Sequence, residues 1–290
     1  RITWLPRMPV GTGLPDLARA VLGDALQLPL IIAPTGFNGM VWPQGDLALA
    51  RAADAAGIAF TLSTVSNYEA TALNRQLQRP AWFQLYPLKD QKTSDRLIDR
   101  AREAGCDKLV VTVDVPALGA REWDQRNYSR PLKLSPSSVL DVLLHPQWLW
   151  QVMLPRGAPE FANLTEFLPE GARSALQGVR FMGTQINPSL AWADIERMRA
   201  RWQGKLVLKG ILCVEDAKRS VEIGADGIVL SNHGGRQLDS CATGIELVGQ
   251  TAAEVGDKLS IIVDGGFRRG SDVLKALALG ADAVMIGRAT

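Results

Sequence analysis

Short apolar segments with a β-type composition recur along the whole chain, and each one ends in a polar or glycine-containing corner. Most of them are separated by stretches with helical periodicity, such as 46–53, 96–104, 214–223 and 273–279. We count eight apolar segments: 30–33, 59–63, 82–86, 108–114, 205–209, 227–231, 259–264 and 283–287. Strands that alternate with helices predict a parallel sheet, because parallel neighbours need a crossover connection.

Three of the eight segments are preceded by the same short sequence motif, in which a glycine ends a helix and a short turn leads into a strand. These motifs lie at 104–107, 224–226 and 280–282. The chain has eight strand segments in 290 residues, and no part of it differs in composition as a second domain would. This pattern predicts a single (β/α)8 TIM barrel domain over residues 1–290 rather than an open doubly wound sheet. The interval 115–204 is too long for one crossover helix, so we expect a long excursion between strands four and five.

The overall charge is close to neutral, since 32 Lys and Arg against 30 Asp and Glu give a net charge of +2. This balance gives no reason to expect nucleic acid as a partner. Cys106, Cys213 and Cys241 lie far apart without metal-ligand spacing, so we expect neither a disulfide framework nor a bound metal. No stretch has the pattern of a signal peptide or a spanning helix, and the expected location is cytoplasmic.

One part of the excursion, residues 139–154, is unusually apolar, is interrupted by Pro146 and contains Trp148 and Trp150. Such a segment is typical of a helix that lies in a membrane interface. The alternative is a buried lid or an oligomer contact, and the sequence leaves both interpretations open. With membrane contact, we expect the protein to lie peripherally on the inner face of the cell membrane.

The stretch 231–239 follows an apolar strand and places a base beside an anion-binding side chain. His233 stands three residues before Arg236, and two glycines between them free the backbone to turn. This arrangement suits proton abstraction from a substrate that is held by its carboxylate. The other histidine, His145, has no neighbouring acid or glycine turn, and we interpret it as a structural or surface residue.

In a barrel, the carboxyl ends of the strands meet at one mouth, and active sites form there. Lys209 ends its strand, and because a buried lysine without a function is uncommon, we expect it to contact an anionic or electron-rich ligand. A lysine that extends to the rim is the alternative. The polar residues expected at the mouth are Ser63, Gln84, Tyr86, Thr112, Asp114, Lys209, Ser231, His233 and Arg236.

Two corners with glycine and arginine follow the last two strands, at 264–270 and 286–289. Barrels often hold a phosphate at this place, where backbone N–H groups and guanidinium groups surround the same anion. The glycine spacing alone is weak evidence, since a tight turn has the same composition. Its position after the seventh strand favours a phosphate site.

Taken together, these sequence motifs resemble those of the family of FMN-dependent enzymes that oxidise α-hydroxy acids. The resemblance covers the whole chain. It is carried by 33–36, 62–64, 82–86, 112–114, 208–210, 231–239, 264–270 and 287–288. Segments 42–53 and 144–146 are most similar to the mandelate-oxidising members, and 63–66 and 210–212 to the lactate-oxidising members. The resemblance implies a TIM barrel, FMN as the cofactor and a homotetramer.

The resemblance also implies a role for each matching residue. His233 would be the general base, oriented by Asp114. Arg121 and Arg236 would hold the substrate carboxylate, and Tyr86 would bond the substrate oxygen. FMN would be held by Ala33, Pro34, Thr35, Ser63, Gln84, Thr112, Lys209 and Ser231, with its phosphate near Asp264, Gly266, Arg268, Gly287 and Arg288. As a cation beside the flavin, Lys209 would stabilise its reduced form.

Two departures from the family concern the ends and one loop. Relatives usually carry a further stretch before Arg1, with a tyrosine that helps to bind the substrate, and another stretch after Thr290 that supplies the eighth helix. Shortly after Arg121, relatives often have a second arginine where this chain has Trp123, so Arg121 alone is matched.

Val65 stands where glycolate-oxidising members have a bulky tryptophan, so we expect a larger substrate side group here. The expected reaction is oxidation of an (S)-2-hydroxy acid to the 2-oxo acid, with mandelate as the first choice and lactate as the second. Ala33 departs from the glycine of mandelate-oxidising members and leaves oxygen open as the electron acceptor. Membrane contact would favour a quinone or another respiratory component. The alternatives are a non-redox barrel that binds FMN or phosphate, and a silent interaction module.

Overall fold

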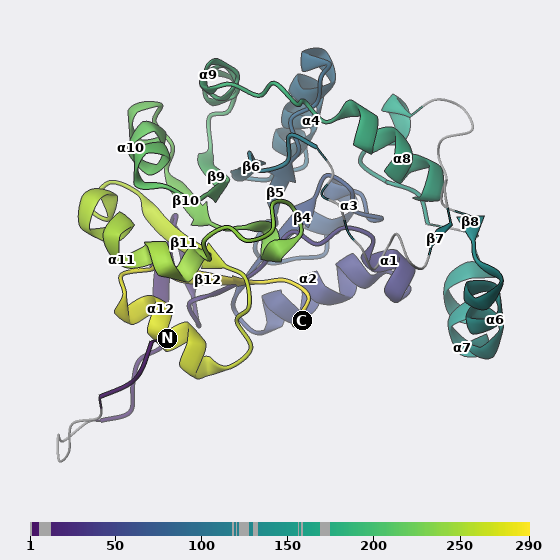
Figure 1. The fold of residues 1–290 in the computed structure, drawn as a ribbon, viewed down its shortest axis with the longest axis horizontal. Helices are drawn as coiled ribbons and strands as arrows, with labels where there is room; N and C mark the ends of the chain where they lie inside the picture. The colour runs from purple at the N-terminus through teal and green to yellow at the C-terminus, as the bar shows by residue number, and fades with distance from the viewer. Residues whose placement is uncertain are drawn as a thin grey trace.

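The computed structural model describes residues 2–5, 13–117, 119, 121, 128–129, 133–155, 157, 159–168 and 175–290. Eight parallel strands close into a barrel in the order β10, β11, β12, β3, β4, β5, β6 and β9 (Figure 1). They are β3 (Leu30–Ile32), β4 (Ala59–Ser63), β5 (Trp82–Leu85), β6 (Lys108–Thr112), β9 (Lys205–Ile211), β10 (Gly227–Leu230), β11 (Ser260–Asp264) and β12 (Ala283–Ile286). All eight predicted strands are confirmed, and so is the (β/α)8 class.

Helices surround the strands (Figure 1). The four predicted helical stretches correspond to α2 (Gly45–Ala55), α4 (Gln91–Glu103), α10 (Val214–Glu222) and α12 (Gly270–Ala278), while α3 (Ala70–Asn74), α9 (Trp192–Arg201) and α11 (Gly244–Val255) were not predicted. α4 begins earlier than predicted, because the Asp90 carboxylate accepts hydrogen bonds from the backbone N–H groups of Lys92 and Thr93. Its polar first turn hides the helical pattern in the sequence.

Each of the three glycine motifs that precede a strand ends a helix, as predicted. Gly105, Gly224 and Gly280 have φ values of 82°, 74° and 108°, in the region that side chains rarely adopt. After each glycine, the next residue donates its N–H to a carbonyl of the last helical turn, as Cys106 does to Ala101. These bonds cap the helices and direct the chain into the next strand.

Alternation along the strands decides which side chains reach the inside of the barrel. A buried apolar layer fills the interior, made by Ile31, Ala59, Trp82, Val110, Val207, Val229, Ile262, Ala283 and Met285. The next inward positions, two residues further along seven of these strands, are Ala33, Gln84, Thr112, Lys209, Ser231, Asp264 and Gly287. The period of the strand therefore places most predicted cofactor residues in one layer above the apolar core.

A hairpin of β1 (Arg19–Val21) and β2 (Asp24–Leu26) closes the other end of the barrel. Its side chains Val21, Leu22 and Leu26 belong to the same buried cluster as the interior layer. The barrel is therefore plugged at its floor and open to ligands at its mouth.

The predicted excursion contains several short elements before α9 resumes the barrel pattern. They are β7 (Tyr128–Ser129), β8 (Lys133–Leu134), α6 (Pro136–Leu144), α7 (Pro146–Trp148), the π-helical turn η1 (Leu149–Met153), the 3-10 turn η2 (Thr165–Phe167) and α8 (Ala175–Gln185). Pro146 ends α6 and begins α7, because proline is favoured in the first turn of a helix. Trp123, where we expected a departure from the family pattern, lies outside the described residues.

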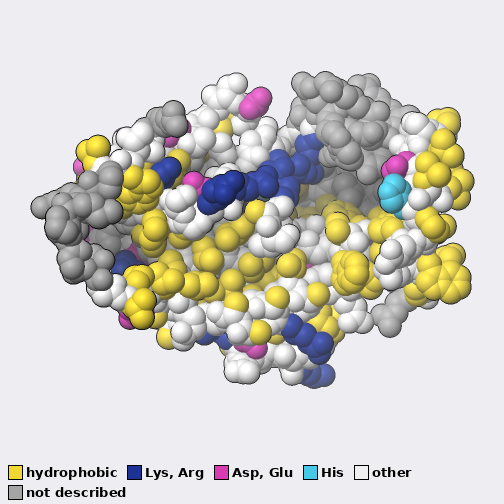
Figure 2. All heavy atoms as spheres, turned by 90° about the horizontal axis from the view of Figure 1, so that it is seen from below, with side chains coloured by type: hydrophobic (Ala, Val, Ile, Leu, Met, Phe, Trp, Pro, Cys, Tyr) yellow, Lys and Arg dark blue, Asp and Glu magenta, His cyan; other side chains and the backbone are white. Residues whose placement is uncertain are grey.

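The apolar segment 139–154 stands at one side of the molecule, where hydrophobic side chains gather at the right-hand end of Figure 2. Leu143 and Trp150 are 62% and 72% exposed, and Leu140, Leu144 and Leu154 are exposed as well. Trp148 attaches the segment to the barrel, since its indole Nε1 donates to the Met40 carbonyl in α1 (Asn38–Val41) at 2.8 Å. In the described part of the chain, no helix is both long and apolar enough to cross a membrane.

Candidate active site

A cavity of about 1170 Å³ opens at the carboxyl ends of the strands. Most of the predicted site residues line it: Ala33, Pro34, Thr35, Tyr86, Thr112, Arg121, Lys209, His233, Arg236, Asp264, Gly266, Arg268, Gly287 and Arg288. Ser63, Gln84, Asp114 and Ser231 are not among the lining residues. They contact residues that form the cavity wall: Ser63 bonds to Val65, Gln84 to Thr112, Asp114 to His233 and Ser231 to Lys209.

Three neighbouring strands are joined behind one wall by a buried chain of hydrogen bonds. Ser63 Oγ in β4 donates to Gln84 Oε1 in β5 at 3.0 Å, and Gln84 Nε2 donates to Thr112 Oγ1 in β6 at 2.9 Å. All three side chains are buried. Because buried polar groups need partners, this chain fixes Thr112, which reaches the cavity.

Lys209 lies on β9, the strand beside β6, in register with Thr112, and is 5% exposed, so it does not extend to the rim. Its Nζ lies 2.7 Å from Asp264 Oδ2 and donates to Ser231 Oγ at 2.8 Å. Burial opposes the charged form, but Asp264 and Asp114 outweigh it and raise the pKa of Lys209 above its ordinary value. A permanent cation therefore faces the cavity.

His233 and Asp114 form a second pair of polar groups at the mouth. The Nδ1 atom of His233 lies 3.1 and 3.2 Å from the two carboxylate oxygens of Asp114. A carboxylate accepts, so Nδ1 carries the hydrogen and Nε2 of the neutral ring is left as a proton acceptor. This is the arrangement that a general base requires.

The backbone around this pair is unusual. His233 has a φ of 58°, and Gly234 and Gly235 continue in the same left-handed region with 63° and 70°. Gly210 has a φ of 108°, and a Cβ there would lie 2.5 Å from the Cβ of Asp114. The His233 turn and the glycine opposite Asp114 are therefore both needed to bring imidazole and carboxylate together.

Tyr86 and the two predicted substrate arginines share the cavity with His233. Desolvation raises the pKa of Tyr86, so its hydroxyl stays protonated at neutral pH and can donate a hydrogen bond. The positive charges of Lys209, Arg121 and Arg236 act on the same hydroxyl. A small carboxylate in this cavity would meet two guanidinium groups and a phenol.

The loops after β11 and β12 contribute glycine and arginine residues to one side of the cavity. Gly265 and Gly266 have φ values of 95° and 81°, and a Cβ on Gly266 would meet nothing within 4 Å, so this backbone faces open space. Arg268 and Arg288 line the same region. Guanidinium groups beside exposed glycine backbone suit a phosphate.

These residues fit FMN. The cavity is large enough for a tricyclic ring, and the phosphate-type corner and the Lys209 cation face it together. Asp264 Oδ1 is buried and has no hydrogen-bond partner among the described residues, which leaves an acceptor for the ribityl hydroxyl groups of FMN. FMN would therefore be held through its phosphate, its ribityl chain and the edge of its ring by different strand ends.

Several lining residues were not predicted from the sequence. Phe161, Met182 and Ile186 come from the excursion and line the same cavity as Val65. Their positions depend on how the excursion folds back over the barrel, and no motif marks them. Val41 and Trp42 also line the cavity and are exposed, which joins its outer rim to the apolar segment.

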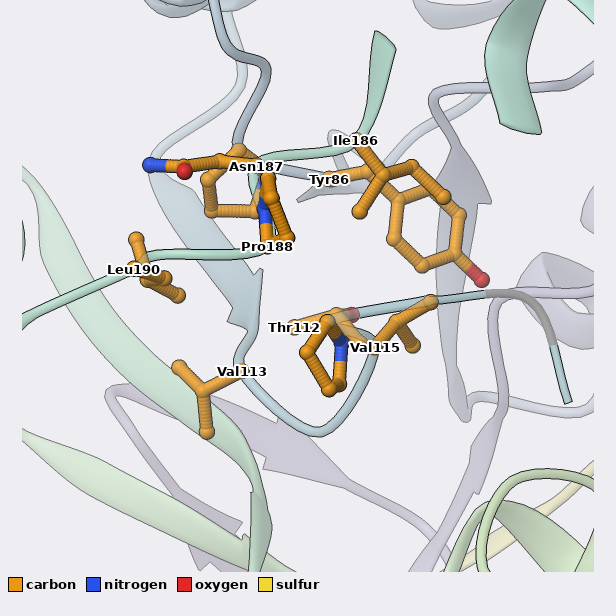
Figure 3. A pocket seen from close by; sticks show the side chains of 10 residues that line it. Tyr86, Thr112, Val113, Val115, Ile186, Asn187, Pro188 and Leu190 are labelled. Carbon is orange, nitrogen blue, oxygen red and sulfur yellow. The ribbon is translucent and has the colours of Figure 1, made fainter. Parts of the chain in front are cut away.

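A second pocket, of about 80 Å³, lies behind the mouth (Figure 3). In Figure 3, Ile186, Asn187, Pro188 and Leu190 lie across the pocket from Thr112 and Val115, and the Tyr86 hydroxyl points away from Leu190. Tyr86, Thr112, Val115 and Ile186 line both pockets and separate them. The small pocket has room for a few water molecules at most, so the large cavity is the site for a cofactor and substrate.

His145 lies far from this chemistry. Its ring is exposed, and Nδ1 lies 2.7 Å from the backbone oxygen and 3.7 Å from the carboxylate of Asp141 in the preceding helix α6. The expectation that His145 has no neighbouring acid was therefore wrong. The sequence interpretation of His145 as a surface residue agrees with this contact.

The family model for FMN-dependent dehydrogenases matches residues 1–290. The chain is 43% identical over 286 residues to (S)-mandelate dehydrogenase of Pseudomonas putida, covering 98% of this chain and 71% of that protein. It is 40% identical over 275 residues to L-lactate dehydrogenase of Acinetobacter baylyi, covering 94% and 71%.

Solved structures agree. The crystal structure of the monotopic membrane protein (S)-mandelate dehydrogenase has a TM-score of 0.90 and 43% identity, covering 98% of this chain and 74% of that one. Mandelate oxidase with (S)-4-hydroxymandelic acid has a TM-score of 0.80 and 38% identity, over the same shares. The chain belongs to the family of FMN-dependent dehydrogenases and is an FMN-dependent oxidoreductase that acts on 2-hydroxy acids.

Proposed function

We propose that the protein oxidises (S)-mandelate to benzoylformate. The observation that carries the proposal is the His233–Asp114 pair, which faces a cavity shared with Arg121, Arg236 and Lys209. FMN, when bound, accepts the two electrons that leave the substrate carbon. A base, an anion clamp and a cation beside the electron acceptor are the parts that this oxidation needs.

Each protein group has one task in this proposal. Arg121 and Arg236 hold the substrate carboxylate and thereby aim the α-carbon at the ring. His233 Nε2 takes a proton from the substrate, and Asp114 stabilises the imidazolium that forms. Tyr86, which stays protonated, donates a hydrogen bond to the substrate oxygen.

The cofactor residues follow from their positions. Ala33, Pro34 and Thr35 offer backbone at the mouth, and Thr112 presents its hydroxyl, fixed from behind by Gln84. Ser63 and Ser231 hold this layer in place through hydrogen bonds to Gln84 and Lys209. Arg268, Arg288 and the glycines 266 and 287 suit the phosphate, while Asp264 links the phosphate side to Lys209.

Size supports a substrate with a large side group. Val65 lines the cavity and leaves room that a tryptophan would fill, and Phe161 and Met182 add apolar surface for an aryl ring. The relatives named for mandelate support the same choice. L-Lactate is the second candidate, because lactate dehydrogenases match this chain at 40% identity.

We further propose that the apolar segment 139–154 rests on a membrane. Its large apolar side chains are exposed, and the solved mandelate dehydrogenase is described as a monotopic membrane protein. The protein would then lie peripherally on the inner face of the cell membrane. Because Val41 and Trp42 border both this surface and the cavity, a lipophilic quinone is the favoured electron acceptor.

A substrate panel tests the proposal. FMN-loaded protein is mixed without oxygen with (S)-mandelate, L-lactate or glycolate, and loss of the visible flavin absorbance is followed in time. We expect (S)-mandelate to bleach fastest and glycolate slowest, with no bleaching by (R)-mandelate. If L-lactate bleaches the flavin faster, lactate and not mandelate is the preferred substrate. If the protein binds FMN but none of the acids bleaches it, the proposal is wrong.

A further inference from the structure

We propose that Gln237 is a positioning residue that holds the backbone of Asp114, Ala117 and Gly119 against the turn of residues 233–237, and thereby sets the spacing of Arg121 and Arg236. The two segments follow different strands, β6 and β10, and are far apart in sequence. The consequence for the substrate rests on the proposed function, in which both arginines bind its carboxylate.

The Gln237 amide uses both of its ends on the facing segment. Its Nε2 donates to the Ala117 carbonyl at 2.7 Å and to the Asp114 carbonyl at 3.3 Å. Its Oε1 accepts the backbone N–H of Gly119 at 3.2 Å. A primary amide has two N–H donors and one carbonyl acceptor, so one side chain bonds three backbone groups of the same loop.

Backbone contact between the two segments supports the same role. A Cβ on Gly119 would lie 2.1 Å from the Arg236 carbonyl oxygen and 3.0 Å from the Cα of Gln237. Only glycine permits this approach, because any side chain would push the two loops apart. Gly119 lies two residues before Arg121, and Arg236 directly precedes Gln237, so the contact links the backbones that carry both guanidinium groups.

The same clamp acts on the base. Asp114, whose carbonyl accepts from Gln237, is the residue whose carboxylate contacts His233. The loop after β6 is therefore joined to the loop after β10 through one side chain from each. Gln237 itself lines the cavity, and through its bonds to the loop backbone its amide would in this way control the positions of Arg121, Arg236 and His233.

Backbone protection tests the clamp itself. In Gln237→Met, the side chain keeps its length and loses every hydrogen bond, so amide hydrogen exchange in FMN-loaded protein should accelerate in a peptide that covers 114–119. Gln76→Met is the matched control: Gln76 also bonds through its amide, to Tyr68 and Ala72, but on the surface near α3. Unchanged exchange in Gln237→Met would overturn the proposal.

Anion binding tests the consequence. Oxalate, a non-reacting dicarboxylate, is titrated into FMN-loaded protein and followed by the change in flavin absorbance. We expect Gln237→Met to raise the Kd for oxalate by roughly tenfold or more while the Kd for FMN is unchanged. In an Arg121→Met background the same change should add little, because the clamp acts through that arginine.

The outcomes are separable. If Gln237→Met weakens oxalate binding equally with and without Arg121, the effect is general loosening and the positioning role is wrong. If oxalate binding does not change at all, the positioning role is also wrong. If Arg121→Met alone leaves oxalate binding intact, the proposed carboxylate site fails, and the exchange measurement still decides whether Gln237 holds the loop.

Discussion

Among the residues that the structure describes, two lysines are buried, one at each end of the barrel. At the floor, Lys108 is 2% exposed, and its Nζ lies 2.9 Å from Asp24 and 2.7 Å from Asp107. At the mouth, Lys209 is 5% exposed, and its Nζ lies 2.7 Å from Asp264. Burial and ion pairing are alike, so they do not separate a structural lysine from a functional one.

What separates them is the surroundings of the partner carboxylate. At the floor, the second oxygen of Asp24 accepts the indole N–H of Trp82 at 2.9 Å, and the hairpin β1–β2 covers the pair. At the mouth, Asp264 Oδ1 has no hydrogen-bond partner among the described residues, and both Asp264 and Lys209 face the large cavity. A buried charge is thus structural where its network is complete and functional where an acceptor is left for a ligand.

The largest expected effect comes from the carboxylate that supports the base. Asp114→Asn should slow anaerobic flavin bleaching by between about 10² and 10⁴-fold, because the amide no longer stabilises an imidazolium at His233. Asp24→Asn is the same chemical change at the floor and should lower stability without slowing bleaching. Equal rates in wild type and Asp114→Asn would contradict the assignment of this pair.

The two lysines themselves give the next prediction. Lys209→Met and Lys108→Met each leave a buried carboxylate without its cation, so each should lower the free energy of unfolding by about 3–5 kcal/mol. Lys209→Met alone should also weaken FMN binding and lower the flavin potential. Chemical denaturation measures the free energy of unfolding, and a redox titration measures the flavin potential. An equal loss of FMN binding in both variants would show that the lysines at the floor and at the mouth do not differ in function.

The pH dependence of the Lys209 pair has a definite sign. Its pKa is raised above 10.5 by Asp264 and Asp114, against the effect of burial, so folding favours the protonated form. The stability that this pair contributes is fully present below about pH 10.5 and is lost as the pH rises through the folded pKa. Loss of Lys209-dependent stability between pH 7 and 9 would contradict this sign.

Substrate size gives a smaller effect at the mouth. Val65→Trp should lower kcat/KM for mandelate by about 10–200-fold relative to glycolate, because the indole occupies the space for an aryl side group. Glycolate serves as the control within the same protein. A mandelate-to-glycolate ratio that does not change would show that the substrate side group lies elsewhere.

The smallest effect concerns the exposed segment outside the barrel. Leu143→Glu should reduce co-sedimentation with anionic vesicles by up to about tenfold, since it removes one apolar side chain and adds a negative charge. Leu274→Glu is the matched control, because Leu274 is an exposed leucine on α12. Equal vesicle binding by both variants would remove 139–154 from the membrane contact.

The eight strands and the class of fold were predictable because strand composition and glycine caps are local signals. The burial of Lys209 was predictable because its strand pattern places it two positions beyond Val207 on the inward face, while its contact with a ligand stays a prediction. The residues of the excursion were not predictable: Phe161, Met182 and Ile186 reach the cavity through long-range packing that no local pattern encodes.

The motif around His233 was predictable, but its geometry was only partly so. His233 and Arg236 were expected from the base and anion-binder spacing, whereas the clamp by Gln237 on residues 114–119 depends on a contact between two loops. The start of α4 at Gln91 shows the same limit on a small scale, because the capping carboxylate of Asp90 extends the helix into a polar stretch.

The account depends on His233 as the base, and His233→Gln tests it most directly. The glutamine keeps a polar side chain of similar reach but cannot take the proton. Anaerobic (S)-mandelate should bleach wild-type flavin rapidly and leave the flavin of His233→Gln oxidised on the same timescale, while both proteins bind FMN equally well. Rapid bleaching in His233→Gln with FMN retained would show that another group takes the proton, and the central claim would be wrong.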